Sequence, residues 1–269
     1  MSSDSLRSLS VATWNVNGIA AHERHVLDWI ETHQPGVIAL QETQCSAVKF
    51  PRRGFTALGY DVIAHGRGGS NGVALASRFG LDDATVGVPG SVAPFDEPRL
   101  VSANIHGIRV ICAYAPNGRK VGTDPHRFKL AWFDLLRAVV DHLDETDIVV
   151  AADLNVASTD IDVWDAVRYR SRNLTSPSER EAFGQLLDVG LVDVVRASLP
   201  DERLSSWWNR RGDFYETDRG WRLDHVLASE GLAERVISVK IDRTVRGVEG
   251  GSDHAPILVE FSPRLRAVP

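Results

Sequence analysis

The chain has 269 residues, of which 43% are hydrophobic and 25% are charged, and its formal net charge is −6. This composition is typical of a folded globular protein and excludes a disordered, collagen-like or coiled-coil chain. The acidic balance argues against a protein that coats nucleic acid by bulk electrostatics, although a nuclease needs only a local basic rim around an acidic centre.

The sequence carries no sign of a membrane span or of a secretory signal. No segment approaches the roughly 20 consecutive apolar residues that a spanning helix needs, and the first ten residues lack an apolar stretch. The two cysteines, Cys45 and Cys112, form neither a disulfide framework nor a Cys-x-x-Cys metal or redox site. We therefore expect a soluble cytoplasmic protein with reduced thiols.

Seven apolar runs have the length and composition of buried strands, and three segments have helical periodicity. Ser176 and Pro177 are the expected cap and first residue of the last helix. A two-residue link, His106-Gly107, indicates one antiparallel strand pair. The strand runs are residues 9–14, 37–40, 73–76, 110–114, 148–152, 223–228 and 257–261, and the helical segments are residues 21–33, 126–143 and 178–189.

Helices and strands are interspersed, and the chain contains no repeat or long linker. This pattern predicts mixed parallel and antiparallel sheets covered by helices. We expect one domain over residues 1–269, with a core from about residue 8 to residue 262.

Polar side chains follow three of the predicted strands: Asn15 and Asn17 the first, Glu42 the second, and Asp153 and Asn155 the fifth. Each alone could be a turn residue. Ligands collect at the carboxyl ends of strands in α/β sheets, so together these side chains indicate one cleft. Converging carboxylates and amides need neutralisation, which a hard cation such as Mg²⁺ or Mn²⁺ supplies, whereas no Cys/His spacing supports zinc.

Near the C-terminus, Asp253 and His254 are adjacent in sequence before the last predicted strand. Neighbouring side chains in an extended segment point to opposite faces, so Asp253 is poorly placed to orient the imidazole. Asp224 is the candidate for that role, and the alternative for His254 is an ordinary core or surface histidine.

Six ordered motifs resemble those of the exonuclease III and apurinic/apyrimidinic endonuclease family, part of the DNase I-like endonuclease-exonuclease-phosphatase superfamily. The resemblance covers residues 11–261. The motifs are Trp-Asn-Val-Asn-Gly-Ile at 14–19, Leu-Gln-Glu-Thr at 40–43, Tyr-Ala-Pro-Asn-Gly at 114–118, Ala-Asp-Leu-Asn at 152–155, Gly-Trp-Arg-Leu-Asp-His at 220–225 and Gly-Ser-Asp-His-Ala-Pro at 251–256.

The resemblance implies an α/β fold that is a four-layer sandwich, in which two facing mixed β-sheets are flanked by helices. It implies that Asn15, Asn17, Glu42 and Asp253 form a metal site, and that Asp153 and Asn155 position and deprotonate the attacking water. Tyr114 would lie near the scissile phosphate with Asn117 in the same loop, and His254, oriented by Asp224, would stabilise the developing charge. Trp207, Trp221 and Leu223 match an apolar pocket for an abasic deoxyribose or a strand end.

Aromatic and basic residues suggest further contacts with a substrate. Trp208, beside the pocket tryptophans, could stack on a base or sugar for roughly 1 to 3 kcal/mol, whereas we expect Trp29, Trp132 and Trp164 to be core or rim residues. Arg99 and Arg119 are the arginines we expect to contact substrate, with solvated surface charge as the alternative. The other candidates are Arg67, Lys120, Arg168, Arg170, Arg172, Arg210 and Arg211.

Three positions depart from the family pattern. Gln44 replaces a common lysine, which we expect to leave the metal carboxylate untouched. Asn209-Arg210-Arg211 replaces Asp-Tyr-Arg and adds positive charge beside the predicted pocket, and Ala152 replaces a glycine.

The sequence thus predicts a Mg²⁺-dependent hydrolase of DNA phosphodiesters, with Mn²⁺ as a substitute. Its expected partner is double-stranded DNA with abasic sites or 3′ ends, and it would act as an apurinic/apyrimidinic endonuclease, a 3′ to 5′ exonuclease or a 3′-phosphodiesterase, as a monomer. The alternatives are a phosphatase or phosphodiesterase for a small or lipid phosphate and a catalytically silent lesion-binding protein. An acidic cleft without metal would repel DNA, which disfavours the silent protein.

Overall fold

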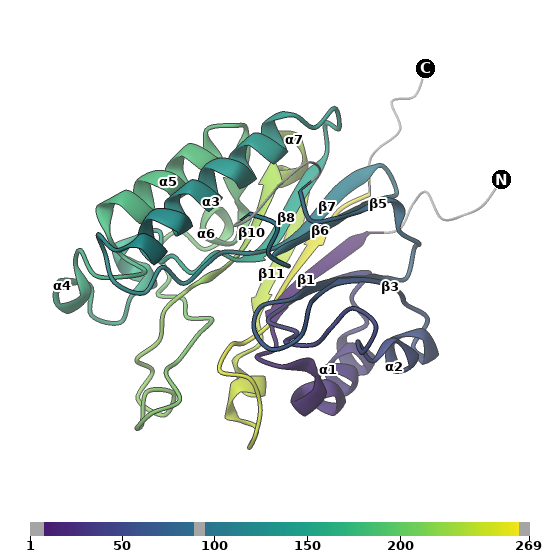
Figure 1. Cartoon of the computed structure of the whole chain (residues 1–269), viewed down its shortest axis with the longest axis horizontal. Coiled ribbons are helices and arrows are strands. Elements are labelled where there is room, and N and C mark those ends of the chain that lie inside the picture. The colour runs from purple at the N-terminus through teal and green to yellow at the C-terminus, as the bar shows by residue number, and fades with distance from the viewer. Residues whose placement is uncertain (1–7, 89–94, 264–269) are drawn as a thin grey trace.

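The computed structural model describes residues 8–88 and 95–263 and contains two six-stranded sheets that pack face to face (Figure 1). The strand order is β11-β12-β1-β2-β4-β3 in the first sheet and β5-β6-β7-β8-β10-β9 in the second. The β1–β2 and β7–β8 pairs are parallel, and the other pairs are antiparallel. The strands are β1 (Leu9–Asn15), β2 (Val37–Gln41), β3 (Asp61–His65), β4 (Val73–Ser77), β5 (Asp82–Val86), β6 (Leu100–Ile105), β7 (Ile108–Tyr114), β8 (Ile148–Asp153), β9 (Leu191–Asp193), β10 (Asp224–Ser229), β11 (Val236–Ile241) and β12 (Ile257–Phe261).

Helices cover the outer face of each sheet, with α1 and α2 on the first and α3 and α5 on the second (Figure 1). The α5 helix begins as expected: Ser176 caps it, and Pro177 is its first residue. The helices are α1 (Ile19–His33), α2 (Arg52–Ala57), α3 (Asp124–Asp141), α4 (Ala166–Tyr169), α5 (Pro177–Leu187), α6 (Val194–Ser198) and α7 (Glu230–Ala233), with 3-10 turns η2 (Asp160–Asp162) and η3 (Arg243–Gly247). None of the described helices is long and apolar enough to cross a bilayer.

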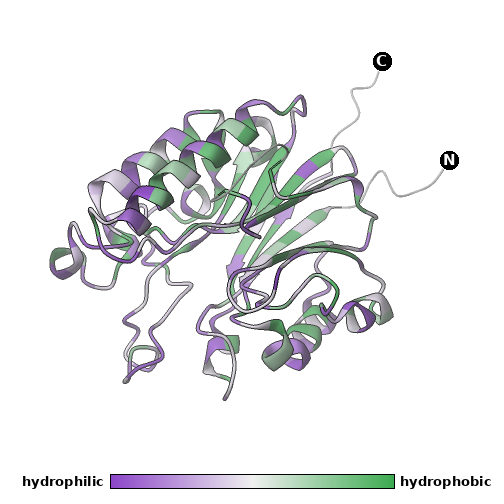
Figure 2. Ribbon diagram, viewed as in Figure 1, coloured by the Kyte–Doolittle hydropathy of each residue, from purple (hydrophilic) through white to green (hydrophobic). Residues whose placement is uncertain are grey.

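Side chains along the inner strands point alternately into the core between the two sheets and into the cores between each sheet and its helices. Val11 packs between the two sheets with Val149 and Val226, whereas Ala12 faces the layer of α1. Since both faces of these strands are covered, they are apolar throughout. Figure 2 shows this apolar colouring on the strands between the helix layers. The four-layer α/β sandwich implied by the resemblance is confirmed.

All seven apolar runs are strands, and the three periodic segments are helices. Five strands lie outside these runs: the inner strand β6, which the sequence indicated only through the His106-Gly107 link to β7, and β3, β5, β9 and β11, which are the four edge strands of the two sheets. An edge strand has one unpaired side and more exposed positions, so it lacks a continuous apolar run. The β6–β7 hairpin forms at His106-Gly107, where both residues have positive φ, as a tight two-residue turn requires.

The topology brings several polar strand ends to one end of the sandwich. Asn15 pairs with Gln41 at the ends of β1 and β2, and Tyr114 pairs with Asp153 at the ends of β7 and β8. Asp153 also pairs with Asp224 at the start of β10. Because the two sheets face each other, these ends form one cluster.

Candidate active site

Asn15 connects carboxylates that belong to different sheets. Its buried amide donates to Glu42 Oε1 at 3.0 Å and to Asp153 Oδ2 at 2.8 Å. Its own Oδ1 accepts a hydrogen bond from the backbone N–H of Asn17 at 3.0 Å. The end of β1 therefore fixes the relative positions of Glu42 and Asp153.

Asn17, Gln44 and Asp253 extend this network toward the surface. Asn17 Nδ2 donates to Asp253 Oδ1 at 2.9 Å. Gln44 Nε2 donates to Asn17 Oδ1 at 3.2 Å and to Glu42 Oε2 at 3.0 Å. The expectation that Gln44 leaves the metal carboxylate untouched is wrong, because the left-handed backbone at residues 42 and 44 turns both side chains toward each other.

Tyr114 closes the cleft from the second sheet, and its hydroxyl donates to Glu42 Oε1 at 2.6 Å. Burial and the neighbouring carboxylates of Glu42 and Asp153 raise the pKa of Tyr114 well above its usual value, so the phenol stays protonated. Arg99 lies against the Tyr114 ring, with its guanidinium 4.9 Å from the ring centre.

The structure contradicts a direct substrate contact for Arg99. Its side chain is 10% exposed, and it binds Glu97, the Asn71 side chain and the carbonyl of Tyr114. Its three hydrogen bonds go to Glu97, Asn71 and Tyr114, and none points into the catalytic cleft. Arg99 therefore holds the ring and the backbone of Tyr114 in place, a role that the sequence alone did not suggest.

Asp153 and Asn155 form a tight turn at the end of β8. Asn155 has a φ of 51°, and its backbone N–H donates to Asp153 Oδ1 at 2.9 Å. The Asn155 amide donates to the Ala115 carbonyl at 3.1 Å, and its Oδ1 accepts from Asn117 Nδ2 at 3.2 Å. Asn117 and Asn155 thus lie side by side.

Lys129 supports this turn from inside the protein, and no sequence pattern had pointed to it. The fully buried ammonium donates to the Asn155 carbonyl at 2.6 Å and forms an ion pair with buried Glu179. Glu179 also accepts hydrogen bonds from the backbone N–H groups of Leu174 and Ser176. One buried pair therefore links α3, α5 and the turn after β8.

His254 lies between two carboxylates. Its Nδ1 lies 2.8 Å from Asp224 Oδ2, and its Nε2 lies 3.9 Å from Asp153 Oδ2. Asp253 points the other way, toward Asn17 and Trp207. The prediction that Asp224, and not Asp253, orients the imidazole is confirmed by this geometry.

The charges of this cluster shift its pKa values. Burial opposes protonation of His254, but Asp224, Asp153 and Asp253 outweigh it and raise the imidazole pKa to about 10. Burial and the negative charge of Asp224 raise the pKa of Asp153 to about 7, against the opposing effect of His254. At neutral pH, His254 is a cation, and Asp153 is close to its ionisation midpoint.

An aromatic cluster adjoins these charged residues. Trp207, Trp221 and Leu223, the residues predicted to line an apolar pocket, pack together in it, and the Trp207 ring centre is 5.1 Å from Trp221 and 6.4 Å from His254. Trp164, expected in the core or rim, is half-buried and packs edge-on against Trp221. Tyr169, at the end of the four-residue helix α4, and Phe214, in a loop, complete the cluster; both were missed because neither lies in a segment long enough to carry a periodic signal.

Trp208 does not face this pocket, which corrects its assignment as a substrate contact. Its side chain is fully buried and packs edge-on against Tyr215 at 5.4 Å. A Cβ atom at Gly220 would lie 2.5 Å from Trp208 Nε1, so the backbone passes directly over the indole. Trp208 supports the loop, while its neighbour Trp207 faces the cleft.

Arg119 is exposed on the loop that carries Asn117, and its backbone N–H donates to the Asn117 side chain. Arg168 and Arg172 lie near the Tyr169 ring. Arg222, in contrast, is fully buried between Asp162, Asp193 and His225. It anchors the segment that carries Trp221 and Leu223, which the sequence could not indicate because arginine is usually exposed.

The donor set at the cleft fits a hard divalent cation. Glu42, Asp153, Asp224 and Asp253 bring four carboxylates together, while His254 and the partly exposed Arg210 bring positive charge. The remaining negative charge and the oxygen atoms of Asn15 and Asn17 suit Mg²⁺ or a similar ion. Ligand atoms of Asp153, Asp224 and His254 also lie within 4.8 Å of one another, but a protonated His254 bound to Asp224 is a poor ligand.

Comparisons with known proteins identify the family of this chain. Residues 12–254 match the model of the endonuclease/exonuclease/phosphatase family. Exodeoxyribonuclease III of Haemophilus influenzae is 32% identical over 264 residues, which cover 93% of this chain and 98% of the relative.

Two solved structures are closely similar. An AP endonuclease from Archaeoglobus fulgidus is 34% identical, with a TM-score of 0.90 over 94% of this chain and 99% of that chain. A variant of the 3′ phosphatase NExo from Neisseria, bound to a product DNA hairpin, is 30% identical, with a TM-score of 0.91 over the same shares of the two chains.

Proposed function

Since the chain belongs to the exonuclease III and apurinic endonuclease branch of the endonuclease/exonuclease/phosphatase family, we propose that it hydrolyses phosphodiester bonds of DNA. The proposed reactions are incision 5′ of abasic sites and removal of nucleotides or blocking groups from 3′ ends. The observation that carries this proposal is the Asp224–His254–Asp153 array, which Asn15 joins to Glu42.

Glu42, Asn15, Asn17 and Asp253 would hold a Mg²⁺ ion. When bound, the cation would stabilise negative charge on the reacting phosphate and favour the ionised form of Asp153. Tyr114 and Gln44 donate hydrogen bonds to the two oxygens of Glu42, and they fix the direction of its carboxylate.

Asp153 is the proposed general base. Its Oδ1 accepts from the backbone N–H of Asn155, and its Oδ2 accepts from the side-chain amides of Asn15 and Asn155. Oδ2 is the proposed atom that takes a proton from water, because it is the oxygen on the side of His254, where the phosphate would lie. With a pKa of about 7, this carboxylate is basic enough to do so at neutral pH.

His254 and Asn117 are the proposed phosphate ligands. A protonated His254 keeps one N–H on Asp224 and directs the Nε2 side toward Asp153, where the phosphate would lie. This fixed positive charge stabilises a more negatively charged transition state. Asn117, beside Asn155, would donate to the same phosphate from the other loop.

The aromatic pocket would select the substrate. An abasic sugar leaves the helical stack at little cost, whereas an intact nucleotide costs a few kcal/mol to extrude. Trp207, which is partly exposed, offers an apolar surface beside His254 that suits a deoxyribose without a base, and the buried Trp221 and Leu223 belong to the same aromatic cluster. A 3′-terminal nucleotide, which has fewer stacking partners, could reach the same site.

The test is cleavage of a labelled duplex that carries one tetrahydrofuran abasic analogue, beside an intact duplex. Wild-type protein with Mg²⁺ should incise the first duplex 5′ of the analogue, and EDTA or the Asp153→Asn substitution should abolish incision. Stepwise digestion of the intact duplex alone would identify an exonuclease. If neither duplex is cleaved, while inositol phosphates or other small phosphate esters are hydrolysed, the DNA assignment is wrong.

A further inference from the structure

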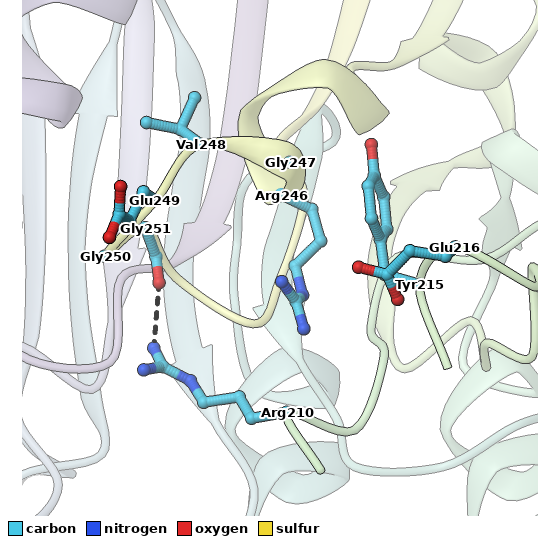
Figure 3. A pocket seen from close by; sticks show the side chains of 9 residues that line it. All are labelled: Arg210, Tyr215, Glu216, Arg246, Gly247, Val248, Glu249, Gly250 and Gly251. Atoms are coloured by element: carbon cyan, nitrogen blue, oxygen red, sulfur yellow. Dashed lines mark hydrogen bonds between the residues drawn. The ribbon is translucent and has the colours of Figure 1, made fainter. Parts of the chain in front are cut away.

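A second cavity, of about 320 Å³, lies beside the catalytic cleft between two loops that connect late elements of the chain (Figure 3). One loop carries Arg210, Tyr215 and Glu216, and the other runs from Arg246 in η3 to Gly251. The second loop continues directly into Asp253 and His254. The cavity and the proposed catalytic centre therefore have a common wall.

Among the described residues, Arg246 enters this cavity without an ion-pair partner. Its guanidinium lies 5.3 Å from the Tyr215 ring centre, and its Nε is buried without a hydrogen bond among the described residues. The structure gives it no ion pair within the described ranges, although most buried polar atoms in proteins are paired. Figure 3 shows its head group pointing into the space above Arg210.

Arg210 connects the cavity to the catalytic cleft. Its NH2 group donates to the Gly251 carbonyl at 2.9 Å, and its Nε lies 3.8 Å from Asp253 Oδ1. The side chain is 47% exposed, so further donors of the guanidinium are accessible. Arg210 is also one of the positions at which this chain departs from the family pattern.

Two acidic residues, Glu216 and Glu249, also line the cavity, but neither forms an ion pair with Arg210 or Arg246. Two guanidinium groups that face one cavity repel each other unless an anion lies between them. A phosphate group has the charge and the oxygen acceptors that match two such groups.

We propose that Arg210 and Arg246 bind a backbone phosphate of the DNA strand next to the nucleotide that is cleaved. This inference rests on the DNA substrate of the proposed function and adds a binding site to it. The proposal places the strand, whose scissile phosphate would lie at His254, along residues 251–253, so that its next phosphates reach the cavity. The pair thus supplies grip on DNA outside the catalytic cleft.

The test uses Arg246→Gln, because Arg246 is remote from the catalytic carboxylates, whereas Arg210 lies beside Asp253. Binding of the abasic-analogue duplex is measured at several salt concentrations in the inactive Asp153→Asn background. The substitution should weaken binding about tenfold at low salt, the loss typical of one charged hydrogen-bonding group. The slope of log affinity against log salt should become shallower by about 0.9, which is the value for one phosphate contact.

Three variants complete the experiment. Arg246→Lys should restore the salt slope, and Glu216→Gln, which removes a negative charge from the same cavity, should tighten binding. Arg78→Gln removes a positive charge just after Ser77, at the end of β4 that lies away from the active site. This substitution should change neither the DNA affinity nor its salt slope. In the active protein, Arg246→Gln should raise KM and leave kcat within about twofold of wild type.

The outcomes separate this inference from the proposed function. If the wild type cleaves the duplex but Arg246→Gln retains the wild-type affinity and salt slope, the cavity does not bind DNA, and the nuclease assignment stands. If inorganic phosphate alone binds the wild type and not the variant, while DNA affinity is equal, the cavity serves a free phosphate instead. If the wild type does not cleave or bind DNA at all, the proposed function itself fails.

Discussion

Asn15 and Gln44 illustrate how single side chains define this site. Asn15 donates to carboxylates from both sheets, and Gln44 donates to Glu42 and Asn17. Neither residue carries a charge, so both can orient the acidic groups without removing the negative potential that a cation needs. Neutral amides therefore fix the positions of the carboxylates, and the negative charge that attracts a cation remains.

Loss of the Glu42 carboxylate should chiefly affect the metal. We expect Glu42→Gln to raise the Mg²⁺ concentration for half-maximal cleavage by at least about tenfold. Loss of a hydrogen-bond partner of a metal ligand already weakens metal binding by about 10- to 100-fold, and loss of the ligand itself should cost no less. A Mg²⁺ titration of cleavage rate gives this value directly. Glu31→Gln, which removes an exposed carboxylate from α1, is the control, and an unchanged Mg²⁺ requirement in Glu42→Gln would exclude Glu42 from the metal site.

Asp224 should control the charge of His254. Asp224→Asn removes the main interaction that raises the histidine pKa to about 10, so this pKa should fall toward its ordinary value of 6.5. The protonated form then disappears as the pH rises through neutrality, whereas wild type keeps it up to about pH 10. We expect kcat at pH 8 to fall about 10²-fold or more, the typical cost of losing one charge-stabilising donor.

A pH profile of kcat/KM from pH 5.5 to 9.5 would show this shift as an earlier alkaline decline in the variant. Asp188→Asn, at the exposed end of α5, controls for net charge. Parallel profiles for Asp224→Asn and wild type would mean that protonated His254 is not needed for the reaction.

At the scale of elements, the catalytic turn after β8 depends on two helices behind it. Lys129 on α3 and Glu179 on α5 meet where the Asn155 carbonyl and the N-terminus of α5 come together. Glu179 completes the capping box with Ser176 while it neutralises Lys129. Helix packing and the position of Asn155 are thus coupled through one buried pair.

Breaking this pair on one side should be costly. Lys129→Met leaves the Glu179 carboxylate buried without its counterion, so we expect a loss of about 3 to 5 kcal/mol in the free energy of unfolding. The double variant Lys129→Met/Glu179→Gln should recover part of that loss, because no buried charge remains. Urea denaturation measures both values.

An exposed pair on the same helix provides the comparison. Arg137 and Asp134 lie 3.8 Å apart at the surface of α3, and Arg137→Gln should change stability by less than about 1 kcal/mol. Equal losses for Lys129→Met and Arg137→Gln would show that burial of the Lys129 pair carries no energetic weight.

At the scale of the whole molecule, the inter-sheet core draws residues from both halves of the sequence, such as Val11 and Val226. We propose on this basis that the described residues form one domain. The active site lies where the ends of the two sheets meet, so neither sheet contains a complete site alone. The match of relatives over more than nine-tenths of the chain supports this view.

The buried Arg222 network should govern acid stability of the whole fold. Burial opposes ionisation of Asp193, but Arg222 and His225 prevail and lower its pKa from 3.8 to about 2, and the pKa of Asp162 is also lowered. A lowered carboxyl pKa adds stability that is fully present well above pH 3.8 and is lost as the pH falls toward 2. For Asp193 this amounts to about 2 kcal/mol.

We therefore expect the free energy of unfolding to decrease steeply between about pH 4 and pH 2. Asp193→Asn should be less stable at pH 7 and should show a smaller decrease in this range. Urea titrations from pH 7 to pH 2.5 measure both curves. If the two proteins lose stability in parallel, Asp193 does not contribute to the acid transition.

The sequence by itself determined the inner strands, the three long helices and the main catalytic candidates. Strands covered on both faces must be apolar throughout, and residues such as Asp153 and His254 have chemistry that short motifs preserve. It could not reveal the edge strands, whose exposed positions break the apolar run.

Only the tertiary structure decided which side chains are buried and hold the loops in place and which face the cleft or the cavity. Trp207 and Trp208 are adjacent and chemically identical, yet one faces the cleft and the other is buried, because chain direction in a loop is set by packing. Arg99 and Arg222 lie inside, and Arg210 and Arg246 meet at a cavity although 35 residues separate them along the chain. Burial and long-range pairing depend on how distant segments fold together, and no local pattern of residues encodes them.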